Sequence, residues 1–354
     1  MTVSTQPPRP GNGTKSSNVS SGDEYISTRG DAEIGGVGGL LDLKIKAGTG
    51  GNDACIATKR MEWRSIESLE RVDYLRAVQC LQDKASKSGL AHARKRFDDF
   101  QAFHISVTHK VHGVGQFLPW HRWFLHVYEK TLRDECKYTG PIPYWDWTKD
   151  ADPKSPEVFR SSPIFDPIYG FGNLPLVQGP LSSGAFAKYQ LIFGVNGTDE
   201  HPNITSHLLE RGFDDTWLTG LTKKTVESTL SQKTYEGFRI ELEGAKVNIG
   251  PKTHNSGHSI VGGDMNDLHS SPGDPLFYLH HANLDRLWWK WQNKGEGNER
   301  LYEISGPLTR NDSSENVTLD TILLTGPFEE RQVTIRQVMD IRKQPLCYTY
   351  VHVE

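Results

Sequence analysis

The sequence predicts a mainly α-helical fold, namely a four-helix bundle with a metal centre in its core, long loops and a few short β-strands. Three observations favour this fold. Apolar side chains recur at helical spacing, six histidines fall in two triplets within those segments, and 34 glycines and 19 prolines indicate many loops. The triplets span residues 104–281 and must meet in one core, so we expect a single domain over residues 51–354.

Before the first histidine triplet, the chain is expected to form an arm and then one helix. Residues 1–50 are polar and rich in glycine and serine, which is typical of a flexible N-terminal segment. A helix is predicted over residues 68–87, because one face at helical spacing contains the apolar side chains of Tyr74, Val78, Leu81 and Ala85.

Two further helices are expected to present the first triplet. Phe97 and Phe100 share a helical face with His104, and His112 follows in the glycine-interrupted connection HGVGQ. Pro119 is expected to open the next helix. The inner face of that helix contains His121, Leu125, Tyr128 and Leu132.

The second triplet begins with His254 and His258 in the motif HNSGH, whose spacing places both imidazoles on one face of a helix. Three imidazoles per metal ion and no thiolate suit copper, so two triplets indicate a pair of copper ions. Any one of these histidines alone is better explained as a hydrogen-bonded core residue. Six together make that explanation improbable.

The last helix of the predicted bundle carries His281. Asp274 and Pro275 are typical of its N-cap and its first position. Its buried face contains Phe277, His281, Leu284 and Trp288. The neighbouring His280 points about 100° away around the helix. We prefer His281 as the ligand because Asp285 lies one turn along, where a carboxylate could orient the imidazole.

The other histidines carry weaker expectations. His269 precedes the last helix on a loop, where it could line the site entrance. His109 and His126 flank the first triplet, and a supporting or surface position is expected for both. Solvated side chains are expected in polar stretches, at His92, His201, His207 and His352.

Four segments resemble the copper-binding motifs of the type-3 copper family, which comprises tyrosinases, catechol oxidases and hemocyanins. In order they read HGVGQFLPWHRWFLHVYEK, PYWDW, HNSGHSIVGG and DPLFYLHHANLDRLWW. The segment RMEWRSIESLERVDYLRAVQCL is similar to the opening of secreted fungal tyrosinase-like enzymes, and CYTYV to the tyrosine motif that closes the family's catalytic core. These segments cover most of residues 55–350, and the motifs are highly specific.

The resemblance implies a catalytic domain with two copper ions and dioxygen as co-substrate. Members of the family oxidise o-diphenols to o-quinones while oxygen is reduced to water, and tyrosinases also hydroxylate monophenols. By the resemblance, the ligands of the two ions are His104, His112 and His121 for one and His254, His258 and His281 for the other.

Two differences from other family members concern the orientation of His112 and the access of substrate to the copper pocket. Many fungal members crosslink the second ligand of the first copper to a cysteine two residues earlier. Lys110 stands there in this chain, so no thioether is possible, and packing and hydrogen bonds alone must orient His112. Longer family members carry a C-terminal domain that plugs the copper pocket. This chain ends at Glu354, so the resemblance implies an open pocket.

Substrate range is expected to depend on residues beside the second copper. In bacterial tyrosinases, a glutamate in an LEG segment and an asparagine after the first ligand hold a water that deprotonates monophenols. Glu243 and Asn255 resemble that pair as candidate catalytic residues, although three extra residues separate Glu243 from His254. An ordinary salt bridge near a helix start is the alternative for Glu243. Leu268 and Phe277 are candidates for substrate contact, with plain packing as the alternative.

Two classes of function remain open at this point. The first is an oxidase of small phenols that converts o-diphenols and hydroxylates monophenols, with strict catechol or o-aminophenol oxidation as the narrower alternative. The second, much less favoured, is a reversible oxygen carrier of the hemocyanin kind, because the same ligands serve both.

Four cysteines and several N-linked glycosylation sequons indicate a secreted, extracellular glycoprotein whose leader has been removed. The sequons lie at Asn12, Asn18, Asn196, Asn203, Asn311 and Asn316. Four cysteines allow three pairings. We favour Cys80–Cys136, which would join two helices expected to pack together, and Cys55–Cys347, which would tie the chain ends.

Composition restricts the partners. A net charge of -4 without long Lys/Arg runs argues against nucleic acid, and no apolar stretch is long enough to span a bilayer. The expected partners are small phenolic substrates, and the expected state is a monomer or weak dimer. Residues 150–235 are rich in proline and glycine and are expected to form a loop-rich excursion near the site rim, in preference to a separate small domain.

Overall fold

The computed structural model describes residues 55–244, 250–295, 297–310 and 312–351, and the arm predicted for residues 1–50 lies outside this part of the chain. The longer helices are α1 (Ser68–Asp83), α2 (Arg96–Val111), α3 (Phe117–Cys136) and α8 (Leu276–Gln292). The shorter helices are α4 (Pro156–Arg160), α5 (Lys223–Leu230), α6 (Tyr235–Glu243) and α7 (Thr253–Ser259). The predicted mainly α-helical fold is confirmed.

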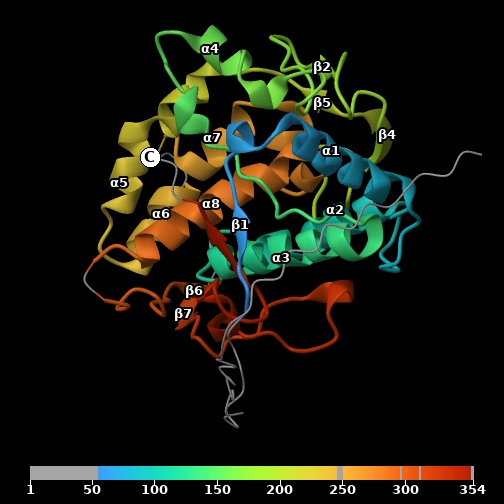
Figure 1. The fold of residues 1–354 in the computed structure, drawn as a ribbon. Helices are drawn as coiled ribbons and strands as arrows, with labels where there is room; N and C mark the ends of the chain where they lie inside the picture. The colour runs from blue at the N-terminus through green and yellow to red at the C-terminus, as the bar shows by residue number, and fades with distance from the viewer. Residues whose placement is uncertain (1–54, 245–249, 296, 311, 352–354) are drawn as a thin grey trace, which may run out of the picture. The chain divides into compact units, whose positions relative to one another are not determined.

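The bundle around the histidine triplets consists of α2, α3, α7 and α8 (Figure 1). Helix α3 packs along α8, α7 contacts α8, and α1 packs on both α2 and α3. The predicted disulfide Cys80–Cys136 is present and joins α1 to the last residue of α3. Short 3₁₀ helices lie in the connections, at Trp63–Ser65, Trp147–Lys149, Pro163–Phe165, Asp215–Leu221, Gly263–Asn266, Ser271–Gly273, Gly326–Phe328 and Ile335–Val338.

Three helix boundaries differ from those predicted. Helix α8 begins at Leu276, one residue after Pro275, although the Asp274 carboxylate still accepts from the Leu276 N–H at its start. Helix α1 ends at Asp83 and not at residue 87, because Ala85 forms a β-bridge with Lys95 and the chain must be extended there. Helix α3 begins at Phe117, two residues before Pro119, which therefore lies inside the first turn. A proline is tolerated there because the first helical N–H groups have no intrahelical acceptor.

The β-strands form two-stranded sheets in the segments before, between and after the α-helices. Strands β1 (Thr58–Arg60) and β8 (Tyr348–Tyr350) are parallel, and the predicted disulfide Cys55–Cys347 is present beside them. The antiparallel pairs are β2 (Gly179–Pro180) with β5 (Glu210–Arg211), β3 (Gln190–Phe193) with β4 (Ile204–Leu208), and β6 (Pro307–Thr309) with β7 (Asp312–Asn316). The few short strands expected from the sequence are thus observed.

Most buried apolar side chains of the described residues belong to one cluster. The cluster includes the inner faces of the long helices, and Phe159, Phe171 and Leu181 from the proline- and glycine-rich middle segment join it. At roughly 25 cal/mol per Å² of apolar surface removed from water, this shared burial is the main favourable contribution to folding. The middle segment is thereby packed against the bundle that carries the histidines.

Asp285 on α8 lies at the centre of a buried polar network. Its carboxylate accepts hydrogen bonds at 2.5 Å from Arg122 Nε and from the hydroxyls of Tyr348 and Tyr350, and it faces Arg60 Nη1 at 3.5 Å. The sequence had suggested that Asp285 orients His281. The structure instead turns the carboxylate toward α3, β1 and β8, because the buried Arg122 guanidinium requires an anion there. The nearer anion of Arg60 is Glu129, at 2.7 Å.

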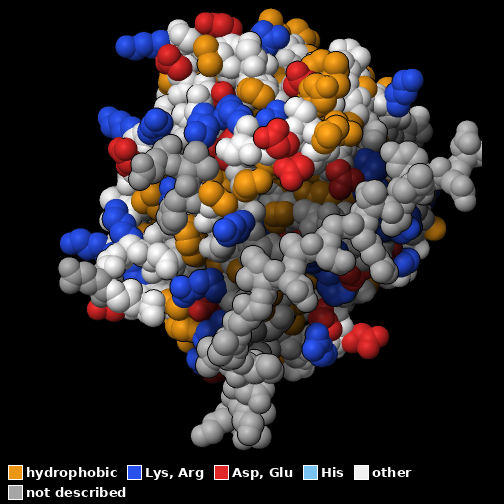
Figure 2. All heavy atoms as spheres, viewed as in Figure 1, with side chains coloured by type: hydrophobic (Ala, Val, Ile, Leu, Met, Phe, Trp, Pro, Cys, Tyr) orange, Lys and Arg blue, Asp and Glu red, His pale blue; other side chains and the backbone are white. Residues whose placement is uncertain are grey.

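The exposed face drawn in Figure 2 carries a mixed set of side chains, with basic and acidic groups interspersed and apolar groups in small clusters. Among the described residues, no helix combines the length and apolar character needed to cross a membrane.

Candidate metal centre

The first triplet converges from α2 and α3. His104 lies on α2, His112 caps its C-terminal end, and His121 lies on α3. Ring centroids are separated by 5.1 Å between His104 and His112, 4.9 Å between His112 and His121, and 5.9 Å between His104 and His121. One ring nitrogen of each residue lies within 4.8 Å of those of the other two, which is close enough to surround one metal ion.

The second triplet converges from α7 and α8 and lies against the first. Ring centroids are 4.7 Å apart for His254 and His258, and 5.3 Å apart from His281 to each of them. The rings of His121 and His281 stack at 4.5 Å, and those of His112 and His254 lie at 6.1 Å. The two triplets therefore face one another, as a dinuclear centre requires.

The hydrogen bonds of the imidazoles fall mainly on one ring nitrogen and leave the other without a partner in three of the six rings. Backbone carbonyls face the Nδ1 atoms of five of these rings, those of His104, His112, His121, His254 and His258. In contrast, the Nε2 atoms of His104, His121 and His254 are buried without any hydrogen-bond partner. Buried ring nitrogens are almost always satisfied, so this arrangement fits a metal ion between the rings.

The electrostatics of the site also suit a metal. Burial, followed by the neighbouring imidazoles, lowers the pKa of His104, His112, His121, His254 and His281 well below the ordinary value, and burial lowers the pKa of His258 to about 4. All six rings are therefore neutral at pH 7. Metal ions bind the neutral imidazole, so no proton has to be displaced.

The choice between His280 and His281 is visible in the hydrogen bonds. Trp147 Nε1 donates to His280 Nδ1 at 3.0 Å, and His280 Nε2 lies 3.0 Å from the backbone carbonyl of His254. Both nitrogens of His280 are thus occupied, whereas His281 Nε2 faces His258 Nε2 at 3.2 Å. His281 belongs to the convergent triplet, and His280 supports the backbone of His254.

Gly257 is a feature of this site that the sequence reading missed. A Cβ at this position would lie 2.1 Å from the His280 ring, so only glycine allows α7 to approach α8 this closely. The available signal was the glycine between the two histidines of HNSGH. A helical glycine costs about 1 kcal/mol relative to alanine, and close packing gives a reason for it.

The open side of the centre is a small cavity of about 100 Å³, lined by His112, His254, Asn255, His258, Ser259, Asn266, Asp267, Leu268 and Ser271. Leu268 lines this cavity and is 39% exposed. Phe277 is fully buried and stacks on His281 with ring centroids 4.1 Å apart. The structure thus places Leu268 at the cavity, whereas Phe277 packs against a histidine of the second triplet.

Glu243 is the last residue of α6, and not near a helix start as expected. One carboxylate oxygen accepts from the backbone N–H of Gly113 at 2.5 Å, and the other pairs with Arg239 Nη1 at 2.5 Å. Burial raises the pKa of Glu243 to about 7, against the opposing effect of Arg239. The backbone carbonyl of Glu243 also lies 3.1 Å from His254 Nδ1. Glu243 therefore contacts a histidine of the second triplet and the residue that follows His112 of the first.

Asn255 follows His254 on α7 and lines the cavity. Its Oδ1 accepts from the backbone N–H of Lys252 at 2.8 Å, which satisfies a free donor at the start of the helix. Among the hydrogen bonds of the described residues, none joins Asn255 to Glu243. The two candidate catalytic residues therefore each have a structural partner of their own.

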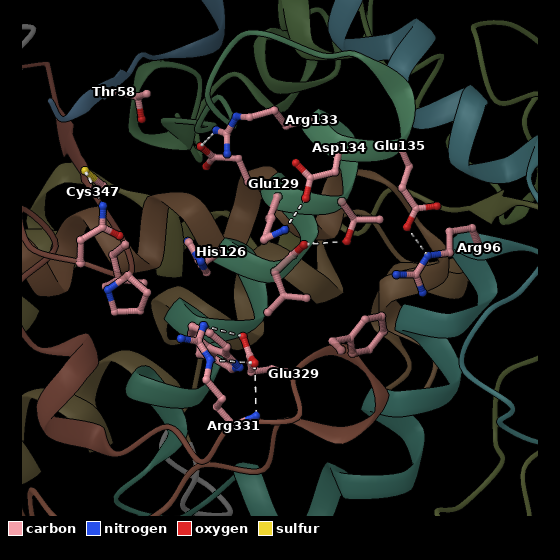
Figure 3. A pocket seen from close by; sticks show the side chains of 18 of the residues that line it. Thr58, Arg96, His126, Glu129, Arg133, Asp134, Glu135, Glu329, Arg331 and Cys347 are labelled. Atoms are coloured by element: carbon pink, nitrogen blue, oxygen red, sulfur yellow. Dashed lines mark hydrogen bonds and ion pairs between the residues drawn. The ribbon is translucent and has the colours of Figure 1, made fainter. Parts of the chain in front are cut away.

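A larger cavity of about 590 Å³ lies elsewhere, between α3 and the C-terminal segment (Figure 3). Its charged side chains are largely neutralised by one another, in the pairs Arg133–Glu129, Lys130–Asp134, Arg96–Glu135 and Arg331–Glu329. Neither histidine triplet lines it. The volume of a cavity alone would therefore not have identified the metal centre.

Comparisons with known proteins agree with this geometry. The model of the common central domain of tyrosinase matches residues 94–294. A tyrosinase-like protein of Diaporthe leptostromiformis is 36% identical over 321 residues, covering 82% of this chain and 77% of its own length. An N-acetyl-6-hydroxytryptophan oxidase of Emericella nidulans is 32% identical over 343 residues, covering 83% of this chain and 92% of its own.

A solved structure shows the same relationship. The structure of a mutant polyphenol oxidase from Thermothelomyces thermophila superposes with a TM-score of 0.72 at 32% identity, covering 84% of this chain and 89% of that one. Family, fold and histidine geometry agree, and the two triplets match the dinuclear copper site of a family that uses dioxygen. The chain therefore belongs to the tyrosinase family of type-3 copper proteins, and it is a copper-dependent oxidoreductase.

Proposed function

We propose that the protein is a secreted oxidase of small o-diphenols, with one copper ion on His104, His112 and His121 and the other on His254, His258 and His281. The observation that carries this assignment is that the two ring nitrogens of histidines in both triplets have different surroundings. Nδ1 atoms are held by backbone carbonyls, and unpartnered Nε2 atoms of both triplets are buried in the centre. Such outer hydrogen bonds fix the ring orientation and the basicity of a copper ligand.

When bound, the copper pair supplies the activation of dioxygen and accepts electrons from the phenol. Two o-diphenols are oxidised for each dioxygen, giving two o-quinones and two waters. The protein contributes a rigid ligand set, a buried apolar floor at Phe277, and a small mouth beside Leu268. The small mouth favours single-ring substrates, and o-aminophenols present the same pair of adjacent donors.

Oxidation of o-diphenols is proposed as the principal activity because the candidate base for monophenols is engaged elsewhere. Both carboxylate oxygens of Glu243 already accept from Gly113 and Arg239, and Asn255 Oδ1 accepts from Lys252. A general base must lie within hydrogen-bond reach of the proton or water on which it acts. Monophenol hydroxylation is therefore proposed to be weak in this protein.

Secretion is supported by the two disulfides, which persist in oxidising compartments. Three sequon asparagines lie in described parts of the chain and are exposed, namely Asn196, Asn203 and Asn316. We propose that these positions carry N-linked glycans.

The test is oxygen consumption by the copper-loaded protein with 4-methylcatechol, 2-aminophenol and tyrosol in parallel. We expect sustained turnover of the first two and at least about tenfold slower turnover of tyrosol, a difference of about 1.4 kcal/mol in barrier. Equal turnover of tyrosol and 4-methylcatechol would overturn the assignment to o-diphenols. Oxygen binding without quinone release would overturn the assignment as an oxidase.

A further inference from the structure

A third group of potential metal ligands lies outside the copper centre. His109, Asp199 and His269 each offer one ligand atom, and these atoms lie within 4.8 Å of one another. His109 Nε2 is 3.5 Å from Asp199 Oδ1, and the rings of His109 and His269 are perpendicular with centroids 5.1 Å apart. Ligands of a tetrahedral zinc ion are roughly 3.4 Å apart, so small side-chain rotations would complete the geometry.

The group is assembled from three segments that are held together independently of it. His109 lies on the last turn of α2, Asp199 in the connection from β3 to β4, and His269 before the 3₁₀ helix at Ser271–Gly273. The Asp267 carboxylate accepts from the backbone N–H groups of Asn196, His269 and Ser270. It thereby fixes the loop of His269 against the loop of Asp199, which preorganises two of the three ligands.

His269 carries an observation that points to a ligand. Its Nε2 is buried from solvent and has no hydrogen-bond partner, although the side chain as a whole is half-buried. Burying such a nitrogen unpaired costs free energy, and a metal ion would satisfy it. The backbone carbonyl of His269 faces His104 Nδ1 at 2.8 Å, so the group lies on the outer side of the first copper triplet.

One cationic side chain opposes a metal at this position. Arg310 Nη1 lies 3.2 Å from His109 Nδ1. Arg310 is exposed, so it is free to move into solvent when a metal ion arrives. Its charge weakens binding, and its removal should strengthen it.

We propose that His109, Asp199 and His269 form a third metal site that binds a single zinc ion. Two imidazoles and one carboxylate form a ligand set that suits Zn²⁺, with the fourth position open to water. The site shares no ligand with the two copper ions. The loop of residues 267–270 connects it to the copper pocket, because Asp267 and Leu268 line that pocket and the His269 carbonyl faces His104 Nδ1.

The experiment is a titration of the copper-loaded protein with Zn²⁺, followed by calorimetry and by metal analysis for copper and zinc after desalting. We expect one zinc per chain in addition to two coppers. His109→Gln and Asp199→Asn should each weaken zinc binding at least about tenfold without loss of copper. Arg310→Ala should tighten it by about tenfold, because a positive charge next to the ion is removed.

His201→Gln is the matched control, since His201 is an exposed histidine in the same β3–β4 connection and belongs to no ligand group. It should bind zinc as the wild type does. The proposal is overturned if the copper-loaded wild type takes up no zinc, if zinc only replaces copper, or if His109→Gln and His201→Gln bind zinc equally. A zinc affinity that Arg310→Ala leaves unchanged would place the ion elsewhere and would also overturn it.

Discussion

The Glu243 carboxylate accepts a hydrogen bond from the backbone N–H of Gly113 at 2.5 Å, although the two residues are 130 positions apart in the chain. Gly113 follows His112 and has a positive φ of 71°, a conformation that glycine adopts without strain. A side chain next to the second triplet thus holds the loop that positions a histidine of the first. We therefore predict that this contact helps to orient His112.

Glu243→Gln should therefore lower copper affinity. The amide cannot pair with both Gly113 and the Arg239 guanidinium, so the loop at His112 loosens. Loss of such a support typically costs about 10- to 100-fold in metal affinity. The measurement is copper retention in competition with a chelator. Glu236→Gln is the control, because Glu236 also pairs with Arg239 but does not contact Gly113; equal copper loss in both variants would contradict the role given to Glu243.

Asn255→Gly tests whether Asn255 acts on substrate or on the helix. The asparagine caps the first turn of α7, and loss of such a cap costs about 1 kcal/mol. We expect turnover of tyrosol and of 4-methylcatechol to fall together, with their ratio unchanged. Asn255→Asp keeps the acceptor oxygen and should restore both. If only tyrosol turnover falls, Asn255 supports monophenol hydroxylation directly.

Helical periodicity was sufficient to predict which faces of α2, α3 and α8 are buried, because side-chain direction in a helix follows from spacing. The grouping of His112, which lies in a connection, with His104 and His121 rested on the resemblance to the family. The same spacing shows that His280 and His281 point to different sides of α8 and cannot both face the centre. The preference for His281 rested on Asp285, whose carboxylate is directed elsewhere. Both disulfides were also anticipated from the expected helix packing and chain-end contact.

What the sequence could not supply are contacts between distant segments whose partners have no common pattern. Asp285 is one turn from His281, but its carboxylate accepts hydrogen bonds from Arg122 and from two tyrosines of β8. His207, expected to be solvated, pairs with Asp264 at 2.8 Å. Side-chain rotamers and long-range packing decide such contacts, and neither is encoded in local periodicity.

Copper content should separate the adjacent histidines of α8. His281→Ala removes a member of the second triplet and should leave about one copper per chain, because two imidazoles alone hold copper weakly. His280→Ala removes hydrogen bonds to Trp147 and to the carbonyl of His254, so about two coppers should remain, with faster loss of one to a chelator. The reverse pattern in metal analysis would show that His280 is the ligand.

Asp285→Asn should reduce stability without emptying the copper site. The substitution leaves Arg122 buried without a counter-charge, whereas Arg60 keeps its ion pair with Glu129 at 2.7 Å. Breaking a buried pair in this way costs about 3 kcal/mol or more. Urea unfolding of the copper-free protein measures the loss. Copper content of the folded variant should equal that of the wild type; selective loss of one copper would instead mean that Asp285 supports His281.

The pair of His207 and Asp264 should make stability depend on pH. The hydrogen bond to the Asp264 carboxylate raises the pKa of His207 to about 9, against the opposing effect of partial burial. Because the folded-state value exceeds the unfolded value of about 6.5, the pair contributes fully below pH 6.5 and its contribution is lost as pH rises through about 9.

We therefore expect the free energy of unfolding to fall by about 1 to 2 kcal/mol between pH 6.5 and pH 9, after allowance for solvent screening of a partly exposed ring. His207→Gln should abolish this component while leaving the rest of the pH profile in place. Urea unfolding of the copper-free protein at several pH values measures it, and copper-free protein is chosen so that metal loss does not mimic the effect. The loop at Asp264 also supports the copper centre, because the backbone carbonyl of the next residue, Met265, faces His258 Nδ1 at 2.8 Å. Parallel pH profiles for the wild type and His207→Gln would show that the ion pair of His207 with Asp264 does not stabilise this loop.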